Sequence, residues 1–171
     1  MKISILYVFL LCSSLTLAQE LTIDEDNTHI SFYFQDQEVS GTMSDFIFMG
    51  QIDLDAIESA TISGSVASES LDTDNWFRNR HLRSTKYFSS KTHPRIYFKS
   101  TLIESTGQGF RVSGTLTIKG ITQEITWFFK NKADTTFVGT TTINTQDFDI
   151  YVYDKRSRNE VSIMITIPYK K

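Results

Sequence analysis

The strongest constraint on the fold is a period of two in the distribution of apolar residues. From about residue 30 onward, short segments alternate apolar and polar side chains, and the segment 160–169 does so with Val161, Ile163, Ile165 and Ile167. Successive side chains of a β-strand point to opposite faces, so this alternation predicts strands with one buried face. Stretches typical of turns separate these segments at 105–109, 119–120 and 131–134. We therefore expect an all-β domain, an antiparallel eight-stranded barrel.

One insert, at about residues 72–92, departs from this alternation. The short polar side chains of 72–75 can satisfy the free amide groups of a first helical turn. Apolar residues then follow at spacings of three and four, and a period of two returns after Pro94. The sequence predicts one helical or looped insert in the barrel.

The N-terminus has the pattern of a secretory signal peptide. An apolar run covers residues 3–17 and small residues precede a cleavage point after Ala18. Two alternatives are a retained membrane anchor and lipidation at Cys12, but the run is short and Leu10 and Leu11 are poor residues before a lipidated cysteine. We expect a signal peptide over residues 1–18, a single domain over residues 19–171, and a periplasmic or secreted protein.

Charge and cysteine content exclude several classes of function. Removing Lys2 with the signal leaves 16 basic and 20 acidic residues, a net charge of −4. This balance argues against a nucleic-acid partner and against tight electrostatic binding to anionic lipid. Without Cys12 the domain has no thiol for a disulfide or for catalysis. We also expect no stable membrane insertion, and the sequence leaves oligomerisation open.

Two blocks of the sequence resemble the YceI-like family, also called polyisoprenoid-binding. They are Ser70–Thr73, Arg78–Ser84, Tyr87–Phe88 and Pro94–Ser100 in and after the insert, and Val112–Thr122 further on. Three places depart from the family pattern: Arg80 stands in place of an aspartate, Asp36 stands in place of a histidine at the end of the first strand, and Asn144–Asp149 stands in place of a late Asn-Arg-x-x-Phe-Gly motif. These departures concern a head-group site and leave the barrel unaffected.

The resemblance implies a lipocalin-like barrel whose interior holds a long isoprenoid lipid, such as a quinone or a polyprenyl phosphate. Within one strand, residues an even number of positions apart lie on the same face, a relation that we call strand parity. We use it to select the residues that we expect to line this tunnel. They are Ile30, Phe32, Phe34, Ile96, Phe98, Val112, Leu116 and Trp127. The alternative is that the aromatic side chains fill the interior as an ordinary packed core.

The insert is expected to act as a lid. Trp76, Leu82 and Phe88 are predicted to pack over the barrel and to close or line its mouth, since all three exposed together would form a sizeable apolar patch. Arg78 and His81 would lie at this mouth.

The cationic residues of the insert have two possible roles. A guanidinium at the mouth could bind a diphosphate or polarise a quinone carbonyl. Alternatively, Arg78 and Arg83 pair with Asp72 and Asp74 and fix the insert to the barrel.

No catalytic or metal-binding motif accompanies these features. His29, His81 and His93 lack the short spacing of a zinc site. We therefore expect a lipid-binding protein that has no catalytic activity, no metal and no cofactor other than the lipid itself. Two alternatives are a lipid-modifying enzyme that uses His81 as its general base and a pocketless secreted β-protein that binds another protein.

Overall fold

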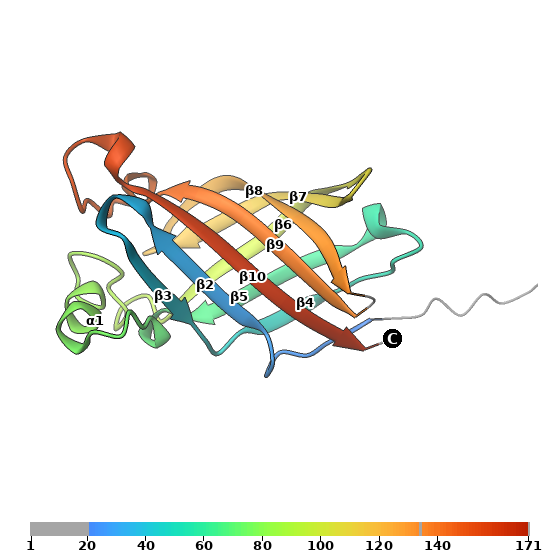
Figure 1. Ribbon diagram of the computed structural model, residues 1–171, viewed down its shortest axis with the longest axis horizontal. Helices are drawn as coiled ribbons and strands as arrows, with labels where there is room; N and C mark the ends of the chain where they lie inside the picture. Colours follow the sequence, from blue (N-terminus) through green and yellow to red (C-terminus); the bar gives the residue numbers. More distant parts are fainter. Residues whose placement is uncertain (1–20, 134, 171) are drawn as a thin grey trace, which may run out of the picture.

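Ten strands of one antiparallel sheet curl into a barrel (Figure 1). The structure is a computed structural model, and it describes residues 21–133 and 135–170. The strands are β1 (Thr22–Ile23), β2 (His29–Phe34), β3 (Val39–Met43), β4 (Ile47–Gln51), β5 (Thr61–Ala67), β6 (Arg95–Thr106), β7 (Gly109–Ile118), β8 (Ile121–Ala133), β9 (Thr136–Asn144) and β10 (Glu160–Lys170). The helices are α1 (Trp76–Leu82) and the short 3-10 turns η1 (Gln35–Gln37), η2 (Ile57–Ser59), η3 (Ser68–Ser70), η4 (Thr145–Phe148) and η5 (Arg156–Arg158).

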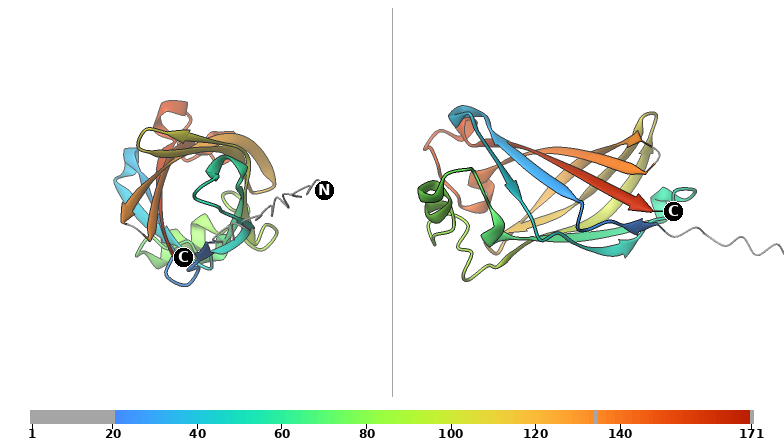
Figure 2. Two further views of the ribbon diagram at one scale, coloured as in Figure 1. Left: turned by 90° about the vertical axis from the view of Figure 1, so that its right-hand side faces the viewer. Right: turned by 60° about the horizontal axis from the view of Figure 1, so that its bottom comes forward.

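The strand order is β3-β2-β10-β9-β8-β7-β6-β5-β4, with β1 added beside β10. Seen along the barrel axis, the strands form a ring (Figure 2). The predicted class, an antiparallel lipocalin-like barrel with one insert, is confirmed.

The strand count exceeds the expected eight because one predicted strand is two strands and because the two-residue strand β1 was not predicted. The pattern from Gly41 to Phe48 suggested one strand followed by a turn at Gly50. In the structure β3 ends at Met43 and β4 begins at Ile47, and Gly50 lies inside β4. Asp45, between them, has a φ of 57°, a left-handed conformation that interrupts a strand.

The first and last strands of the sheet path, β3 and β4, are consecutive in the chain but do not pair with each other in the described residues. Other segments bridge this seam. At one end Thr42 and Asp72 exchange backbone hydrogen bonds of 2.8 and 3.0 Å, and at the other end the N–H of Leu21 donates to the carbonyl of Ile52. In between, the N–H of Phe48 donates to the Glu25 carboxylate at 2.6 Å. The start of the insert is therefore part of the barrel wall.

Register between neighbouring strands keeps apolar side chains on the inner face. Three pairs between β2 and β10 illustrate this: Ile30 with Ile165, Phe32 with Ile163, and Phe34 with Val161. A bulge in β6 between Ser100 and Leu102 shifts the alternation by one residue. Beyond the bulge Ile103 is buried and Leu102 is exposed.

The insert comprises α1 and the loop that returns the chain to β6. It lies at one end of the barrel, opposite the end at which β10 finishes (Figure 1). Asn75 caps α1, since its side-chain oxygen accepts a hydrogen bond from the N–H of Arg78 at 2.9 Å. No helix among the described residues has the length and apolar character needed to cross a bilayer.

Candidate lipid-binding cavity

A cavity of about 320 Å³ lies inside the barrel and has side chains of β2 to β10 around it. This volume is within the range of small-molecule sites. Seven of the eight residues predicted from strand parity line it: Ile30, Phe32, Phe34, Ile96, Phe98, Leu116 and Trp127. The interior is thus not completely filled by side chains. Contact of these seven residues with a lipid stays a prediction.

Val112 is the exception among the predicted lining residues. It points inward but is fully buried and does not reach the cavity. Its partners across the sheet are Ile103 of β6 and Trp127 of β8. Larger side chains around the small valine separate it from the cavity. Strand parity therefore predicted correctly that Val112 is on the inner face of the sheet, but it could not predict how far Val112 lies from the cavity.

Aromatic rings crowd the end of the cavity far from α1. The ring centroids of Phe110 and Phe129 are 5.1 Å apart and stacked, and Phe137 meets Phe110 edge to face at 5.4 Å. Tyr169 stacks on Phe137 at 4.5 Å. Gly139 allows this packing, because a Cβ on it would lie 2.4 Å from the Phe129 ring. This end of the cavity is therefore apolar and closely packed.

Our sequence reasoning missed several lining residues. Phe110 and Phe129 share parity with Leu116 and Trp127 on the same strands, so the alternation was sufficient to find them. Tyr87, Phe148, Ile150 and Val152 also line the cavity but come from non-strand segments without a period of two. No periodic signal marks such positions.

Six insert residues line the cavity at its other end, and two of them are Thr73 and Tyr87. The other four, Arg78, His81, Leu82 and Phe88, were predicted for the mouth. The His81 ring also lies 4.8 Å from the ring of Tyr87. The polar groups of the insert and the apolar rings of the far end give the cavity two chemically different ends.

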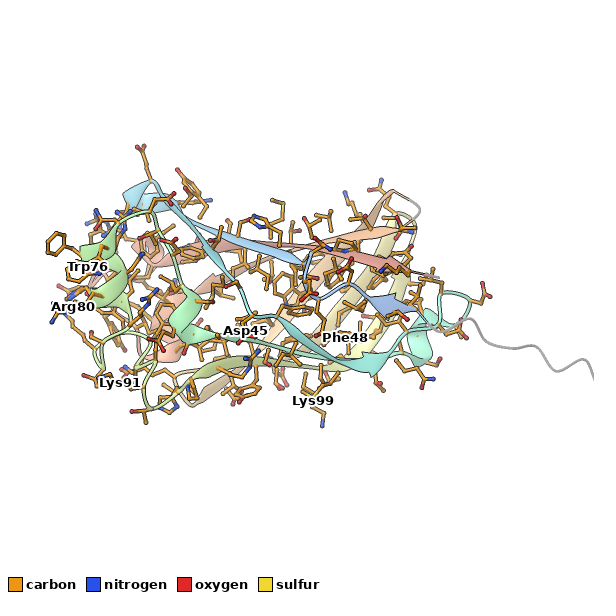
Figure 3. The ribbon with its side chains drawn as sticks, turned by 90° about the horizontal axis from the view of Figure 1, so that it is seen from below. Asp45, Phe48, Trp76, Arg80, Lys91 and Lys99 are labelled. Carbon is orange, nitrogen blue, oxygen red and sulfur yellow. The ribbon has the colours of Figure 1, made fainter. Side chains whose placement is uncertain are left out.

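The prediction that Trp76 packs over the barrel is wrong. Its side chain is 64% exposed and its ring contacts Phe77 edge to face at 4.9 Å. In Figure 3 Trp76 and Arg80 project from the outer side of α1. On a helix, residues four apart share a face, so Arg78 and Leu82 face the cavity while Trp76 and Arg80 face outward.

The arginines of the insert are held by oxygen atoms other than aspartate carboxylates. Arg78 donates from Nε to the hydroxyl of Thr73 at 2.8 Å and from Nη2 to the carbonyl of Thr73 at 2.7 Å. Arg83 donates from Nη2 to the carbonyl of Leu71 at 2.9 Å. Within residues 21–133 and 135–170, no ion pair joins these arginines to Asp72 or Asp74. The alternative that the arginines fix the insert was correct about their structural role and wrong about their partners.

Asp72 is engaged by a different residue, Asn79. The Nδ2 of Asn79 donates to the Asp72 carboxylate at 2.7 Å, and the N–H of Asp74 donates to the same oxygen at 2.9 Å. These hydrogen bonds, that of Asn79 foremost, lower the pKa of the Asp72 carboxyl. Since the backbone of Asp72 is bonded to Thr42 of β3, this network connects α1 to the seam of the barrel.

Two exposed ion pairs connect the other loops at this end. Arg158 donates to Asp36 at 2.6 and 2.9 Å, and Arg156 donates to both oxygens of Asp147 at 2.6 and 2.9 Å. The hydrogen bond from each arginine lowers the pKa of its aspartate. Asp36, which occupies the place of a family histidine, thus joins η1 to the loop before β10.

The His81 imidazole has no orienting partner in the part of the chain that the structure describes. Neither a carboxylate nor a backbone carbonyl accepts a hydrogen bond from it, and its one described ring contact is with Tyr87. A histidine that acts as a general base is usually positioned by such a group. His29 is exposed on β2, and the ring of His93 lies against Gly120.

A wider depression lies on the outer surface of the barrel and is lined by residues of β2, β3 and β6 to β10. Most of its lining residues are polar, among them Ser113, Thr126, Thr140 and Ser162. It shares four apolar residues with the interior cavity, Phe32, Ile143, Phe148 and Ile163, but the interior cavity is the more apolar of the two. We therefore place the candidate site inside the barrel.

The fold and its apolar cavity are those of a lipocalin-like barrel. A YceI-like domain matches residues 21–169, and the chain belongs to this family. A UPF0312 protein of Ectopseudomonas mendocina is 28% identical over 149 residues, which cover 78% of each chain. Protein YceI of Salmonella newport is 28% identical over 114 residues, covering 64% of this chain and 60% of that protein.

Two solved structures share the fold. BcnA of Burkholderia cenocepacia superposes with a TM-score of 0.76 at 20% identity, covering 88% of this chain and all of BcnA. A polyisoprenoid-binding domain of Saccharophagus degradans, implicated in plant cell wall breakdown, superposes with a TM-score of 0.59 at 13% identity, covering 88% and 97% of the two chains.

Proposed function

We propose that this protein binds a long, thin lipid of isoprenoid type inside the barrel, with the apolar tail toward the aromatic end and the head group toward α1, and that it catalyses no reaction on it. The observation that carries the proposal is the contrast between the two ends of the cavity. Phe110, Phe129 and Phe137 lie at one end, and Arg78 and His81 lie at the other. The likeness to a polyisoprenoid-binding domain supports the same ligand class.

The energetics of an empty apolar space favour a ligand. A void in a core costs about 24 cal/mol per Å³, so a cavity of about 320 Å³ represents on the order of several kcal/mol of lost packing. Each buried methylene contributes up to about 0.8 kcal/mol. A tail of a few isoprene units could therefore supply most of a micromolar affinity, about 8 kcal/mol, after the costs of association.

The head group would meet the guanidinium of Arg78. Thr73 engages its Nε and Nη2, and within residues 21–133 and 135–170 no acceptor bonds to Nη1. This nitrogen can donate to a phosphate or to a quinone carbonyl. We propose that the protein performs this binding in the periplasm or outside the cell, after removal of residues 1–18.

Trp127 offers a direct test, because it lines the cavity and only one other tryptophan, Trp76, is present. In a Trp76→Phe background, a polyprenyl quinone should quench Trp127 emission with saturation. Leu116→Trp would obstruct the cavity with a larger ring and adds a second tryptophan to this background, so its binding is measured by displacement of a fluorescent polyprenyl probe. It should reduce affinity at least about tenfold, which corresponds to 1.4 kcal/mol. Thr115→Trp, on the outer face of the same strand, is the matched control and should bind as the parent does.

The head group is tested with a polyprenol, a polyprenyl phosphate and a quinone that share one tail. Arg78→Gln should weaken binding of the phosphate more than binding of the polyprenol. If none of these lipids binds, or if folded Leu116→Trp binds them as tightly as the parent protein, the interior is not the lipid site.

A further inference from the structure

The outer face of α1 carries the two most exposed large apolar side chains in the part of the chain that the structure describes. Phe77 is 78% exposed and Trp76 is 64% exposed. Their rings contact each other, and the Arg80 guanidinium lies 5.6 Å from the centre of the Trp76 ring. Figure 3 shows Trp76 and Arg80 at the tip of the molecule, beyond the barrel. An exposed apolar pair of this kind at one end of a domain indicates a contact surface.

The same end carries a local excess of positive charge. Residues 72–93 contain five basic and two acidic residues, a net charge of +3, on a chain whose total is −3. Arg78 and Arg83 are bonded to oxygens of Thr73 and Leu71. The exposed cations are Arg80, Lys86 and Lys91, and the exposed anions are Asp72 and Asp74. The overall charge balance, which argued against tight electrostatic binding to anionic lipid, conceals this concentration of basic residues.

We propose that α1 docks this protein on a bilayer surface that bears anionic head groups. Trp76 and Phe77 enter the interfacial layer, where amphipathic aromatic rings are favoured, and Arg80, Lys86 and Lys91 approach the lipid phosphates. Two rings and a few cations give reversible binding at the surface and need no stable insertion into the bilayer.

The geometry favours a membrane over a protein partner. A stable protein interface buries about 800 Å² per partner, and a seven-residue helix with two exposed rings offers far less. A bilayer needs no shape complementarity, and each basic residue near an anionic surface contributes about 1 kcal/mol. Docking would also direct the polar end of the cavity toward the membrane, where a lipid could enter. That consequence rests on the proposed function, but docking itself does not.

Trp76 reports docking when it is the only tryptophan. We would prepare Trp127→Phe, confirm its fold from its melting temperature, and add vesicles of phosphatidylcholine with and without phosphatidylglycerol, free of any isoprenoid. Trp76 emission should shift to shorter wavelength with the anionic vesicles and be quenched by brominated acyl chains. Neutral vesicles should give a much smaller shift.

Variants in this background test the residues. Phe77→Ala should lower vesicle affinity about tenfold, from the loss of one buried aromatic side chain. Arg80→Glu should lower it by about tenfold or more, because it reverses a charge at the surface. Phe128→Ala removes a ring that is 54% exposed on the wall of the barrel, away from α1, and should change nothing.

Unchanged Trp76 emission with every vesicle would overturn the proposal, and so would equal affinities for the Phe77→Ala and parent proteins. Photocrosslinking from residue 77 that captures a protein partner, while vesicles give no shift, would instead assign the patch to that partner. If the protein docks on vesicles but no isoprenoid binds inside the barrel, the proposed function is contradicted and the docking proposal stands.

Discussion

The side-chain oxygen of Asn79 accepts two hydrogen bonds from Thr73, one from its backbone N–H at 2.9 Å and one from its hydroxyl at 2.6 Å. Both residues are buried. Because Nδ2 of Asn79 also holds the carboxylate of Asp72, one amide group connects α1 to the segment that bridges the barrel seam. Asn79 is thus the buried side chain that, together with Arg78 and Arg83, holds the insert in position.

We expect Asn79→Leu to loosen the insert selectively. The substitution keeps the branched shape of the side chain and leaves the buried donors of Thr73 without an acceptor, a cost of about 1–3 kcal/mol. Hydrogen exchange should accelerate across residues 72–93, while the amides of β7 to β10 keep their protection. Asn131→Leu, at an exposed position of β8, is the control. Equal acceleration in every strand would show that Asn79 supports the whole domain and not the insert alone.

Leu82→Asp should weaken lipid retention more than it lowers the melting temperature. Leu82 lines the mouth of the cavity, so a carboxylate there would face the apolar ligand. The rate of lipid loss to acceptor vesicles should rise about tenfold, which corresponds to loss of most of one buried leucine. Thr85→Asp adds the same charge at an exposed position of the insert and should have little effect. If Leu82→Asp unfolds the domain and the folded fraction retains lipid normally, the insert does not gate the cavity.

Much of the barrel could be predicted because a period of two reports directly which face of a strand is buried. Ile30, Phe32 and Phe34 were placed correctly on this basis, and only Val112 failed to reach the cavity. Parity cannot show how far a small side chain lies behind its larger neighbours. It also cannot anticipate a residue such as Asp45, whose left-handed backbone divides one apparent strand into two.

The insert was harder to predict because a helix of seven residues has apolar side chains on several faces. Trp76 and Leu82 have similar hydrophobicity, and the sequence does not say which of them faces the barrel. In the structure the outcome follows from buried polar contacts. Asn79 and Arg78 bond to Thr73, which turns the Leu82 side of α1 inward and leaves Trp76 in solvent.

Acid should weaken the loops at the mouth of the barrel. Hydrogen bonds from Arg158 lower the pKa of Asp36, so this pair stabilises the folded state above the unfolded pKa of about 4. That stability is lost as the pH falls toward the lower folded pKa. Asp36→Asn should lower the melting temperature slightly at pH 7, and the difference from the parent should disappear near pH 2. A difference that persists or grows in acid would contradict this account of the pair.

The N-terminus remains a prediction, since residues 1–20 lie outside the described part of the chain. We expect the mature protein to begin at Gln19, because small residues end the apolar run at Ala18. Intact-mass analysis of protein exported by its native host checks this. A mass corresponding to an acylated Cys12 at the N-terminus would contradict it.

The claim that the barrel binds an isoprenoid lipid is tested most directly by identifying the lipid that copurifies with the protein. Protein purified from its native host without detergent would be extracted with organic solvent, and the extract would be analysed by mass spectrometry beside that of Leu116→Trp. We predict an isoprenoid lipid in near-stoichiometric amount in the extract of the parent protein, and much less of the same lipid in the extract of Leu116→Trp. An extract without any enriched lipid, or equal amounts of one lipid from both proteins, would contradict lipid binding inside the barrel.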